Sequence, residues 1–377
     1  MKKITFAVGD LQMGGSMRVQ SVIANNLDKS KFDISIFSMR KVESYFPLDA
    51  PVSYAKHAIT KMQFRKILVS TGFYKYILRR PVDMTVIPNK EMVDDLVIFV
   101  EENKIETLIL VEQWAVVAKD LKDRLPNVTL ISWLHLNTKI YETFLYGKSY
   151  EKLLSGYNNS DVICVLTKED KDHLNSLGYR NVRVMHNPVT IDSDNSQSEL
   201  ESKVISFVGR IDYNHKGLDY LLEIAKQLDN DWKIDVAGSG MWLEEQRFKR
   251  DIRRNGLEHK LVWRGAKSGA QLQEHFKNSS LFISTSRFEG FPLVFAEAMS
   301  FGLPVLSMSN SGSREVLDEG RYGVLVENGN IEKFMNELKN LQNSKELREK
   351  YAHLSLQRSE MLEIDKIINN WEQLLLK

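Results

Sequence analysis

The chain has 377 residues, 43% of them hydrophobic and 27% charged, with a formal net charge of +1. This profile is typical of a globular protein with a large core and about two domains, and it gives no support to a nucleic-acid partner. The single cysteine, Cys164, excludes an internal disulfide and a cysteine-rich zinc site, and its apolar neighbours favour a buried structural thiol. The apolar stretch at the N-terminus is too short for a signal peptide, and no run reaches the ~18 apolar residues of a membrane span. We therefore expect a cytoplasmic location.

The first half of the chain alternates β-rich runs with helical patterns, which is typical of α/β folds with parallel sheets. We expect strands at 4–9, 32–37, 107–112, 128–134, 162–166 and 182–186. Helical patterns lie near 17–28, 89–103, 114–125, 141–156 and 168–177. The first strand leads into Gly14 and Gly15, and a glycine pair at a strand-to-helix turn lets a ligand approach the backbone closely. Because glycines are common in such turns, a purely structural turn is an equal alternative.

The segment from Pro51 to Val82 is strongly basic. It holds seven basic residues and no acidic one, with aromatic residues interleaved. One interpretation is a solvated helical face that packs on the domain through Ile67, Leu68, Ile77 and Leu78. The other is contact with an anionic membrane surface or another polyanion, which we favour because no acid offsets the charge. The contacts would then come from Lys61, Arg65, Lys66, Lys75, Arg79 and Arg80.

A second series of strands begins after residues 187–203, a polar segment that we interpret as a linker. These strands are expected at 204–209, 232–238, 261–265, 281–285, 304–308 and 322–326. Two successive doubly wound units imply two Rossmann-like domains, 1–187 and 188–359. Ligands of such sheets bind at the carboxyl ends of the strands, so we expect the site in a cleft between the domains. We expect the final helix, about 360–377, to pack back on the first domain.

The loop after the first strand of the second series carries two basic residues, Arg210 and Lys216. Two fixed cations at this position suit a diphosphate, which arginine contacts through its fork and lysine as a point charge. A solvated loop with chance basic residues is the alternative. Further along, Gly238 in a Gly-Ser-Gly turn, and Ala266 and Lys267 after the next strand, would line a base pocket through their backbone or form plain structural turns.

Glu289 and Glu297 flank a Gly/Pro loop that follows the expected strand 281–285. The loop lets both carboxylates face one ligand. The unpaired N–H groups at the start of the helix that carries Glu297 favour an anion. One short segment therefore offers carboxylates for hydroxyl groups and amides for phosphate, which are the two kinds of group that a sugar nucleotide presents.

The order of these motifs resembles the C-terminal domain of retaining GT-B glycosyltransferases, specifically the large glycosyltransferase family 4. The motifs are GRxDxxxKG at 209–217, GSG at 238–240, and ExxxxxxxE at 289–297 followed by GLPVL. The resemblance covers about 200–330, whereas the N-terminal glycine turn and SWLH at 132–135 match more loosely. It implies an α/β protein of GT-B fold, with two Rossmann-like doubly wound domains and a cleft between them, and a hexosyltransferase activity.

The resemblance implies a role for each matching position of the second domain. Arg210 and Lys216 would neutralise the diphosphate of the donor and the charge that develops on the leaving group. Glu289 would contact hydroxyl groups of the donor sugar, and Glu297 would bind the two ribose hydroxyls. The loop that would cradle the sugar and the distal phosphate consists of Gly290, Phe291, Pro292, Leu293 and Val294.

Two positions of the first domain match as well. Gly15 would approach the diphosphate, and His135 would lie near the transferred sugar. Leu136 and Asn137 follow this histidine, where many relatives have Asp or Gly. A histidine at the end of a strand is otherwise more often an ordinary hydrogen-bonded residue.

The resemblance is consistent with a mechanism in which fixed cations and amides, rather than a metal, stabilise the departing nucleoside diphosphate. We therefore expect no metal and no cofactor. Two Asp-x-Asp sequences match a metal-binding pattern by letter only, because Asp192 and Asp194 lie in the polar linker and Asp170 and Asp172 in a surface-like helix. Two glutamates with binding roles and no water-activating partner also argue against a glycoside hydrolase.

The expected reaction moves a hexose or N-acetylhexosamine from a nucleotide sugar, with UDP as the expected nucleotide. The acceptor would be a hydroxyl group of a cell-surface glycan, a lipid-linked saccharide or a teichoic-acid-type polymer, and the protein could be peripheral at the inner face of the cell membrane. The alternatives are a non-catalytic GT-B subunit of another transferase and another GT-B enzyme, such as a sugar-nucleotide epimerase or a phosphorylase. A non-catalytic subunit would tend to lose the basic and acidic pairs that this chain keeps.

Overall fold

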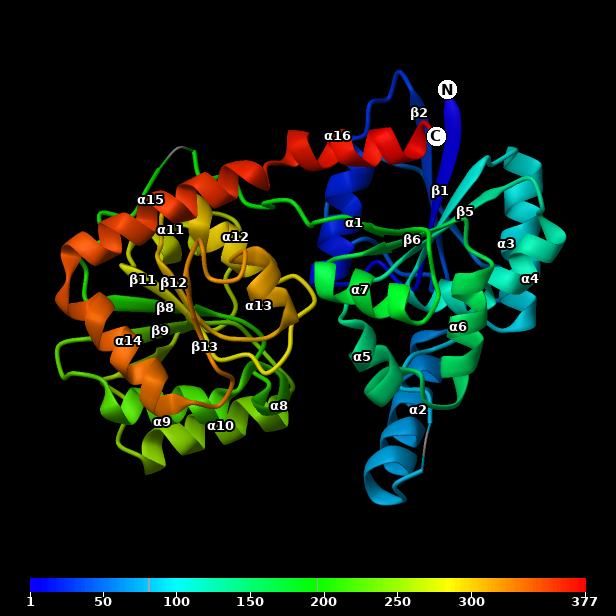
Figure 1. Ribbon diagram of the computed structural model, residues 1–377. Coiled ribbons are helices and arrows are strands. Elements are labelled where there is room, and N and C mark those ends of the chain that lie inside the picture. The colour runs from blue at the N-terminus through cyan, green and yellow to red at the C-terminus, as the bar shows by residue number, and fades with distance from the viewer. Residues whose placement is uncertain (81, 195) are drawn as a thin grey trace. The chain divides into compact units, whose positions relative to one another are not determined.

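The structure is a computed structural model that describes residues 1–80, 82–194 and 196–377, apart from the side chains of Lys61, Leu68, Lys75 and Tyr76. The chain forms two compact α/β units (Figure 1). Unit 1 consists of Met1–His186 and Ile367–Lys377, and unit 2 consists of Asn187–Lys366.

Unit 1 is built on a parallel sheet with the strand order β3-β2-β1-β4-β5-β6-β7. The strands are β1 (Lys2–Val8), β2 (Phe32–Ser38), β3 (Val52–Tyr54), β4 (Thr107–Val111), β5 (Thr129–Trp133), β6 (Val162–Val165) and β7 (Val182–Val184). The central strands are apolar along most of their length because helices cover both faces of such a sheet. The strand order reverses between β1 and β4, which is the position where sheets of this kind bind ligands at their carboxyl ends.

Helices and helical turns alternate with these strands (Figure 1). They are α1 (Gly15–Asn26), α2 (Lys61–Gly72), η1 (Phe73–Ile77), α3 (Lys90–Asn103), η2 (Glu112–Val117), α4 (Ala118–Arg124), α5 (Thr138–Ile140), η3 (Tyr141–Leu145), η4 (Gly147–Ser149), α6 (Tyr150–Asn158), α7 (Lys168–Ser176) and the C-terminal α16 (Ile364–Leu375). Trp371 of α16 is fully buried against Trp133 of β5, with ring centroids 4.6 Å apart. Among the described residues, no helix is both long enough and apolar enough to cross a membrane.

The sequence analysis does not predict strand β3. This strand has only three residues, follows Pro51 and forms the edge of the sheet beside β2. All three of its residues are half-buried. A run this short carries too little alternation to be distinguished from a loop. Cys164 in β6 is buried as expected, and burial raises the pKa of its thiol above the ordinary value.

Helix α2 and the turn η1 project away from the sheet of unit 1, and we call residues 61–80 the arm (Figure 1). A capping box between Thr60 and Gln63 begins it. The alternative interpretation, in which Ile77 and Leu78 pack on the domain, is wrong for these two residues, because they are 67% and 45% exposed. Ile67 is half-buried, and the side chain of Leu68 lies outside those described.

Unit 2 is a second parallel sheet, with the strand order β10-β9-β8-β11-β12-β13. Its strands are β8 (Val204–Val208), β9 (Lys233–Ala237), β10 (Leu261–Trp263), β11 (Leu281–Ser284), β12 (Val305–Met308) and β13 (Val324–Val326). Its helices are α8 (Tyr213–Lys216), α9 (Leu218–Gln227), α10 (Trp242–Arg254), α11 (Ala270–Lys277), α12 (Leu293–Ser300), α13 (Ser311–Val316), α14 (Ile331–Asn343) and α15 (Lys345–Met361). The order reverses between β8 and β11, so the loops after these two strands share the carboxyl edge at the switch point.

The polar segment that precedes β8 is not a loose linker. Val189 donates its backbone N–H to Leu362, and Ser198 donates its own to Phe301. Leu200 is buried. The described part of this segment therefore packs on the body of unit 2.

Candidate active site

The loop after β8 is shaped by two local features. Asp212 caps the short helix α8 by accepting the backbone N–H of His215 at 2.9 Å. Gly217 then ends α8 with a φ of +62°, and a Cβ at this position would lie 2.2 Å from the backbone oxygen of Thr285. Only glycine fits this left-handed position so close to another backbone. The loop is thereby fixed against the residue that follows β11.

The same contact fixes Lys216. The Thr285 hydroxyl donates a hydrogen bond to the Lys216 backbone oxygen at 2.7 Å. The aliphatic part of the lysine side chain lies against Gly209, where an added Cβ would be 3.3 Å from the lysine Cε. The ammonium group then reaches Glu289, with Nζ 2.5 Å from Oε1. Two of the predicted site residues, which are distant in the sequence, therefore form one ion pair.

His215 is a third member of this group, which the sequence analysis does not single out. Its Nε2 lies 3.6 Å from the second carboxylate oxygen of Glu289, and its ring stacks on Phe288 with centroids 4.4 Å apart. The signal was available, because His215 directly precedes Lys216 in the conspicuous loop. A single histidine in a polar loop, however, carries no sequence pattern that distinguishes a site residue from a solvated one.

The electrostatics of Glu289 are dominated by this pair of partners. Burial by itself would raise the pKa of the carboxyl group, but the Lys216 ammonium and the His215 ring more than offset that effect. The net pKa lies well below the usual range of a glutamate. Glu289 is therefore an anion at neutral pH, and a carboxylate in that form accepts hydrogen bonds from hydroxyl groups.

The loop that leads from Glu289 into α12 is held from the other side by the start of α13. A Cβ on Gly312 would lie 2.8 Å from the backbone oxygens of both Glu289 and Gly290. The Ser311 hydroxyl also donates to the Glu289 backbone oxygen at 3.3 Å. Helix α12 then begins after Pro292 without a side-chain cap. No side chain caps the first N–H groups of α12, and N–H groups at such a position can bind an anionic or hydroxyl ligand.

Glu297 lies on the second turn of α12 and its carboxylate is fully buried. The hydroxyl of Thr190 donates to its Oε1 at 2.7 Å. In the preceding loop Gly290, Phe291 and Pro292 are likewise buried, whereas Leu293 and Val294 are half-buried. Contact between Glu297 and a ribose would therefore require a rearrangement around Thr190, and the predicted role stays a prediction.

Arg210 differs from Lys216. Its side chain is exposed and forms no hydrogen bond or ion pair with another described residue. A free guanidinium beside a partnered ammonium leaves one cation of the loop available to an anion. Its role toward a diphosphate stays a prediction.

The Gly-Ser-Gly turn after β9 has a structural reason for its glycines. Gly238 has a φ of +151°, and a Cβ there would lie 1.8 Å from the Gly209 backbone oxygen. A Cβ on Gly240 would lie 2.2 Å from the Ile211 backbone oxygen. The turn therefore supports the loop that carries Arg210 and Lys216, and a contact with a base stays a prediction.

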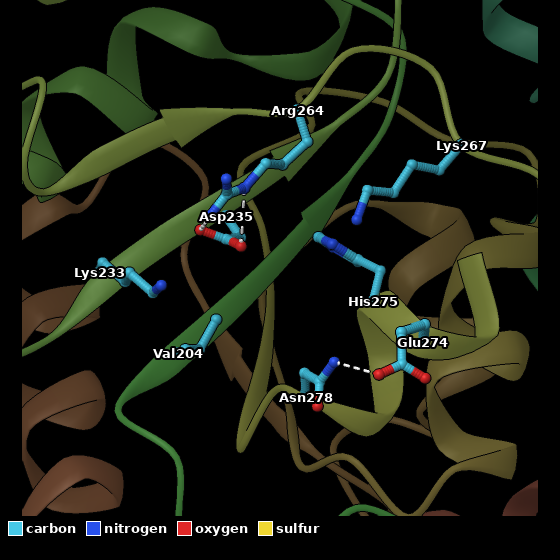
Figure 2. Close-up of a pocket in the computed structure, with 8 residues that line it drawn as sticks. All are labelled: Val204, Lys233, Asp235, Arg264, Lys267, Glu274, His275 and Asn278. Carbon is cyan, nitrogen blue, oxygen red and sulfur yellow. Dashed lines mark hydrogen bonds and ion pairs between the residues drawn. The ribbon is translucent and has the colours of Figure 1, made fainter. Parts of the chain in front are cut away.

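Figure 2 shows where the Lys267 side chain lies. It lines a pocket of about 230 Å³ with Val204, Lys233, Asp235, Arg264, Glu274, His275 and Asn278. Val204 and Lys233 are the first residues of β8 and β9, so this pocket reaches the amino ends of those strands. In Figure 2 the lysine side chain points toward His275. A base contact through the backbone of Ala266 and Lys267 stays a prediction.

In unit 1, His135 follows the carboxyl end of β5 and is buried. The Tyr141 hydroxyl accepts the backbone N–H groups of His135 and Leu136 at 3.0 and 3.1 Å. Burial lowers the pKa of His135 to about 3, so the imidazole is neutral. Gly15 is the first residue of α1, whose N-cap Gly14 provides no side-chain hydrogen bond.

Helix α7 is mostly exposed or half-buried, but Asp170 itself is not a surface residue. Asp170 is buried and is bound by both Thr138 and Thr167, whose hydroxyls donate to its carboxylate at 2.9 and 2.6 Å. Thr167 in turn caps the N-terminus of α7 by accepting the backbone N–H of Asp170. Asp192 instead accepts the backbone N–H of Asp194 in a local turn.

Comparisons with known proteins place part of the chain in a family. Residues 189–355 match the family described as Glycosyl transferases group 1. An uncharacterized glycosyltransferase of Haemophilus influenzae is 28% identical over 384 residues, which cover 100% of each chain. The lipopolysaccharide 1,6-galactosyltransferase of Salmonella typhimurium is 27% identical over 56% of this chain and 57% of its own. The poly(glycerol-phosphate) alpha-glucosyltransferase of Bacillus subtilis is 26% identical over 59% of this chain and 33% of its own.

Solved structures share the fold over the whole chain. The apo form of the lipopolysaccharide outer core galactosyltransferase WaaB has a TM-score of 0.73 at 18% identity, covering 100% of this chain and 99% of its own. Anabaena Alr3699/HepE in complex with UDP-glucose has a TM-score of 0.74 at 15% identity, with the same coverage. The fold is thus that of GT-B proteins. Residues 189–355 belong to the glycosyl transferases group 1 family, also called glycosyltransferase family 4.

Proposed function

We propose that this protein is a retaining, metal-independent transferase that moves a hexose or N-acetylhexosamine from a UDP-sugar. The acceptor is a hydroxyl group of a cell-surface glycan, a lipid-linked saccharide or a teichoic-acid-type polymer. The observation that carries the proposal is the buried Lys216–Glu289 pair at the switch point of unit 2. A cation and a sugar-binding carboxylate at that edge match the two ends of a nucleotide sugar.

In the proposed reaction, the bond between the anomeric carbon and the distal phosphate oxygen breaks, and its electron pair leaves with UDP. Lys216 and the exposed Arg210 stabilise the charge that develops on the diphosphate. Glu289 accepts hydrogen bonds from the sugar hydroxyls, and the uncapped start of α12 adds N–H donors. The acceptor oxygen forms the new bond to the same carbon and loses its proton.

The names of the relatives support the choice of donor and acceptor. One solved relative was crystallised with UDP-glucose, and the curated relatives include transferases that act in lipopolysaccharide synthesis and on poly(glycerol-phosphate). These names support a nucleotide-sugar donor and an acceptor in the cell envelope. They leave the individual sugar and the linkage of this chain to experiment.

A donor screen tests the proposal. Purified protein is incubated with UDP-, GDP- and ADP-sugars in the presence of EDTA, and released nucleoside diphosphate and thermal stabilisation are measured. Slow release from one UDP-sugar is the expected result. Stabilisation by a donor without any release, with or without acceptor probes, would instead favour a non-catalytic subunit of another transferase.

We further propose that the arm of unit 1 binds an anionic membrane at its inner face, where a lipid-linked acceptor would be found. Its exposed apolar side chains are Met62, Val69, Phe73, Tyr74, Ile77 and Leu78. Arg65, Lys66, Arg79 and Arg80 are exposed among them, and the arm contains no acidic residue. Lys61 and Lys75 have side chains outside those described. Apolar side chains for the acyl region and cations for the headgroups are what an interfacial helix presents.

A further inference from the structure

Three neighbouring strands of unit 1 each lead into a polar residue at the carboxyl edge of the sheet. β1 leads into Asp10, β4 into Glu112 and β5 into His135, and the three strands are adjacent in the order β1-β4-β5. Because the carboxyl ends of parallel strands meet at one edge, these side chains belong to one surface. The edge lies at the switch point of unit 1. Of the three, only His135 has a role predicted from the sequence.

Glu112 has a left-handed backbone, with a φ of +48°. A residue with a Cβ pays a free-energy cost for this conformation, which glycine avoids. Lys104 also has a positive φ, but it terminates α3, where that conformation is ordinary. Glu112 instead is the first residue of η2 and directly follows the buried strand β4. A glutamate held in a strained position at the edge of a sheet suggests a role for its side chain.

The turn at Glu112 is packed tightly on its neighbours. A Cβ on Gly9 would lie 1.6 Å from the side-chain nitrogen of Gln113, so this side chain packs against the end of β1. A Cβ on Gly156 of α6 would lie 1.8 Å from the Ala115 backbone oxygen. The backbone that follows Glu112 is therefore held against α6 at Ala115, which limits local shifts of the turn.

The Glu112 carboxyl group is half-buried and makes no hydrogen bond or ion pair with another described residue. The charge of Asp10 acts on Glu112, and the charge of Glu112 in turn raises the pKa of Tyr141 and Tyr146. Asp10 itself is paired with Arg40, with Oδ2 2.7 Å from the guanidinium. Burial, and then the charge of Asp10, raise the pKa of Glu112 to about 7. The group thus lacks a protein partner and changes its charge near neutral pH.

His135 supplies an independent second observation at this edge. It is only 6% exposed, and its Nε2 has no hydrogen-bond partner among the described residues. Buried polar atoms of folded proteins almost always have a partner, in the protein or outside it. A neutral imidazole nitrogen and a carboxylate at one edge, both without protein partners, suit a ligand rich in hydroxyl groups.

We propose that Glu112 is an acceptor-binding residue, whose carboxylate accepts a hydrogen bond from the saccharide hydroxyl group that is glycosylated. This inference rests on the proposed transferase function and adds the residue that orients the second substrate. An ionised carboxylate accepts hydrogen bonds only, whereas the protonated form can also donate one, so binding of the hydroxyl favours the ionised form.

The test uses full-length protein, the UDP-sugar found in the donor screen, and octyl hexopyranosides as the acceptor probe. We expect Glu112→Gln to lower kcat/KM for the acceptor about 10-fold, because the amide oxygen still accepts a hydrogen bond but lacks the charge that strengthens it. The dissociation constant of UDP should stay within about twofold of the wild-type value. The matched control is Glu106→Gln, at the opposite end of β4, where the side chain accepts the Lys3 backbone N–H. This control should transfer at the wild-type rate.

The second variant, Glu112→Gly, separates binding from folding. Glycine relieves the strain of the left-handed backbone at position 112. The Tm of Glu112→Gly should therefore equal or exceed that of the wild type, while transfer falls at least as far as in Glu112→Gln.

The pH dependence of transfer gives a further test. The acceptor kcat/KM of the wild type should rise with pH up to about 7, and this rise should be absent from Glu112→Gln. Transfer within threefold of wild type in both variants, or an unchanged pH limb in Glu112→Gln, would overturn the assignment. Absence of donor turnover in the wild type would count against the transferase function itself.

Discussion

The Lys216 ammonium group and the Glu289 carboxylate form a nearly buried ion pair, although 73 residues separate them in the chain. Their side chains are only 13% and 10% exposed. A pair this well shielded is costly to break from one side, because the remaining charge has no partner. The pair therefore has a structural role in addition to its proposed role in binding the donor, and mutations can separate the two roles.

Lys216→Ala should destabilise the protein by about 3 kcal/mol, because it leaves the Glu289 carboxylate buried and without its ammonium partner. The double variant Lys216→Ala with Glu289→Gln should recover most of that stability and none of the turnover. Chemical denaturation and release of UDP measure the two effects. A double variant that regains activity together with stability would show that the pair acts only in folding.

The pair should also make stability depend on pH in a defined direction. The folded-state pKa of Glu289 lies below its ordinary value of 4.5, so the pair stabilises the protein above pH 4.5 and loses this contribution as the pH falls further. The difference in Tm between the wild type and Glu289→Gln should therefore be constant from about pH 6 to 8 and shrink below about pH 4.5. Thermal melts across this range measure it. A difference that grows on acidification would contradict the assigned pKa direction.

Gly238→Ala should lower stability by about 2 kcal/mol or more, since its Cβ would collide with the Gly209 backbone oxygen at a strained φ. Gly14→Ala is the matched control, because a Cβ there meets no atom within 4 Å. Its stability should stay within about 0.5 kcal/mol of the wild type. Urea denaturation compares the two. Equal losses of stability in Gly238→Ala and Gly14→Ala would contradict the assignment of a structural role to the glycines of the Gly-Ser-Gly turn.

The arm should bind vesicles that contain anionic lipid. Replacing Arg79 and Arg80 with Gln should weaken partitioning to vesicles rich in phosphatidylglycerol about 30-fold, at about 1 kcal/mol for each cation. Phe73→Ser with Ile77→Ser should abolish it. Met241→Ser with Leu243→Ser, a more exposed apolar pair at the start of α10, should not. Flotation assays measure the partitioning. Undiminished vesicle binding by the arm variants would show that the arm is a solvated helical face and does not bind the membrane.

Most strands of both sheets could be predicted from the sequence, because buried parallel strands are continuous apolar runs bounded by turns. β3 could not, since three half-buried residues at an edge carry no distinct pattern. The burial of Asp170 escapes prediction for a related reason. Its helix is polar, and only the tertiary contacts with Thr138 and Thr167 show that the residue is buried.

The contacts within the site, like the burial of Asp170, could not be predicted from the sequence. The residue types of Lys216 and Glu289 follow from their motifs, but their pairing depends on the neighbouring positions of β8 and β11 in the sheet. The approach of His215 to Glu289 has the same origin. Glu112 follows an ordinary strand in the sequence, and only its backbone conformation and its lack of partners among the described residues distinguish it.

The measurement that tests the central claim most directly is steady-state release of UDP from UDP-sugars by the wild type and by Glu289→Ala, with EDTA in excess. We expect the wild type to turn over one UDP-sugar at a rate that EDTA does not change. The rate of Glu289→Ala should be at least about 100-fold lower, although the variant stays folded. Full turnover by the folded Glu289→Ala variant, or wild-type turnover abolished by EDTA and restored by a divalent metal, would contradict the account.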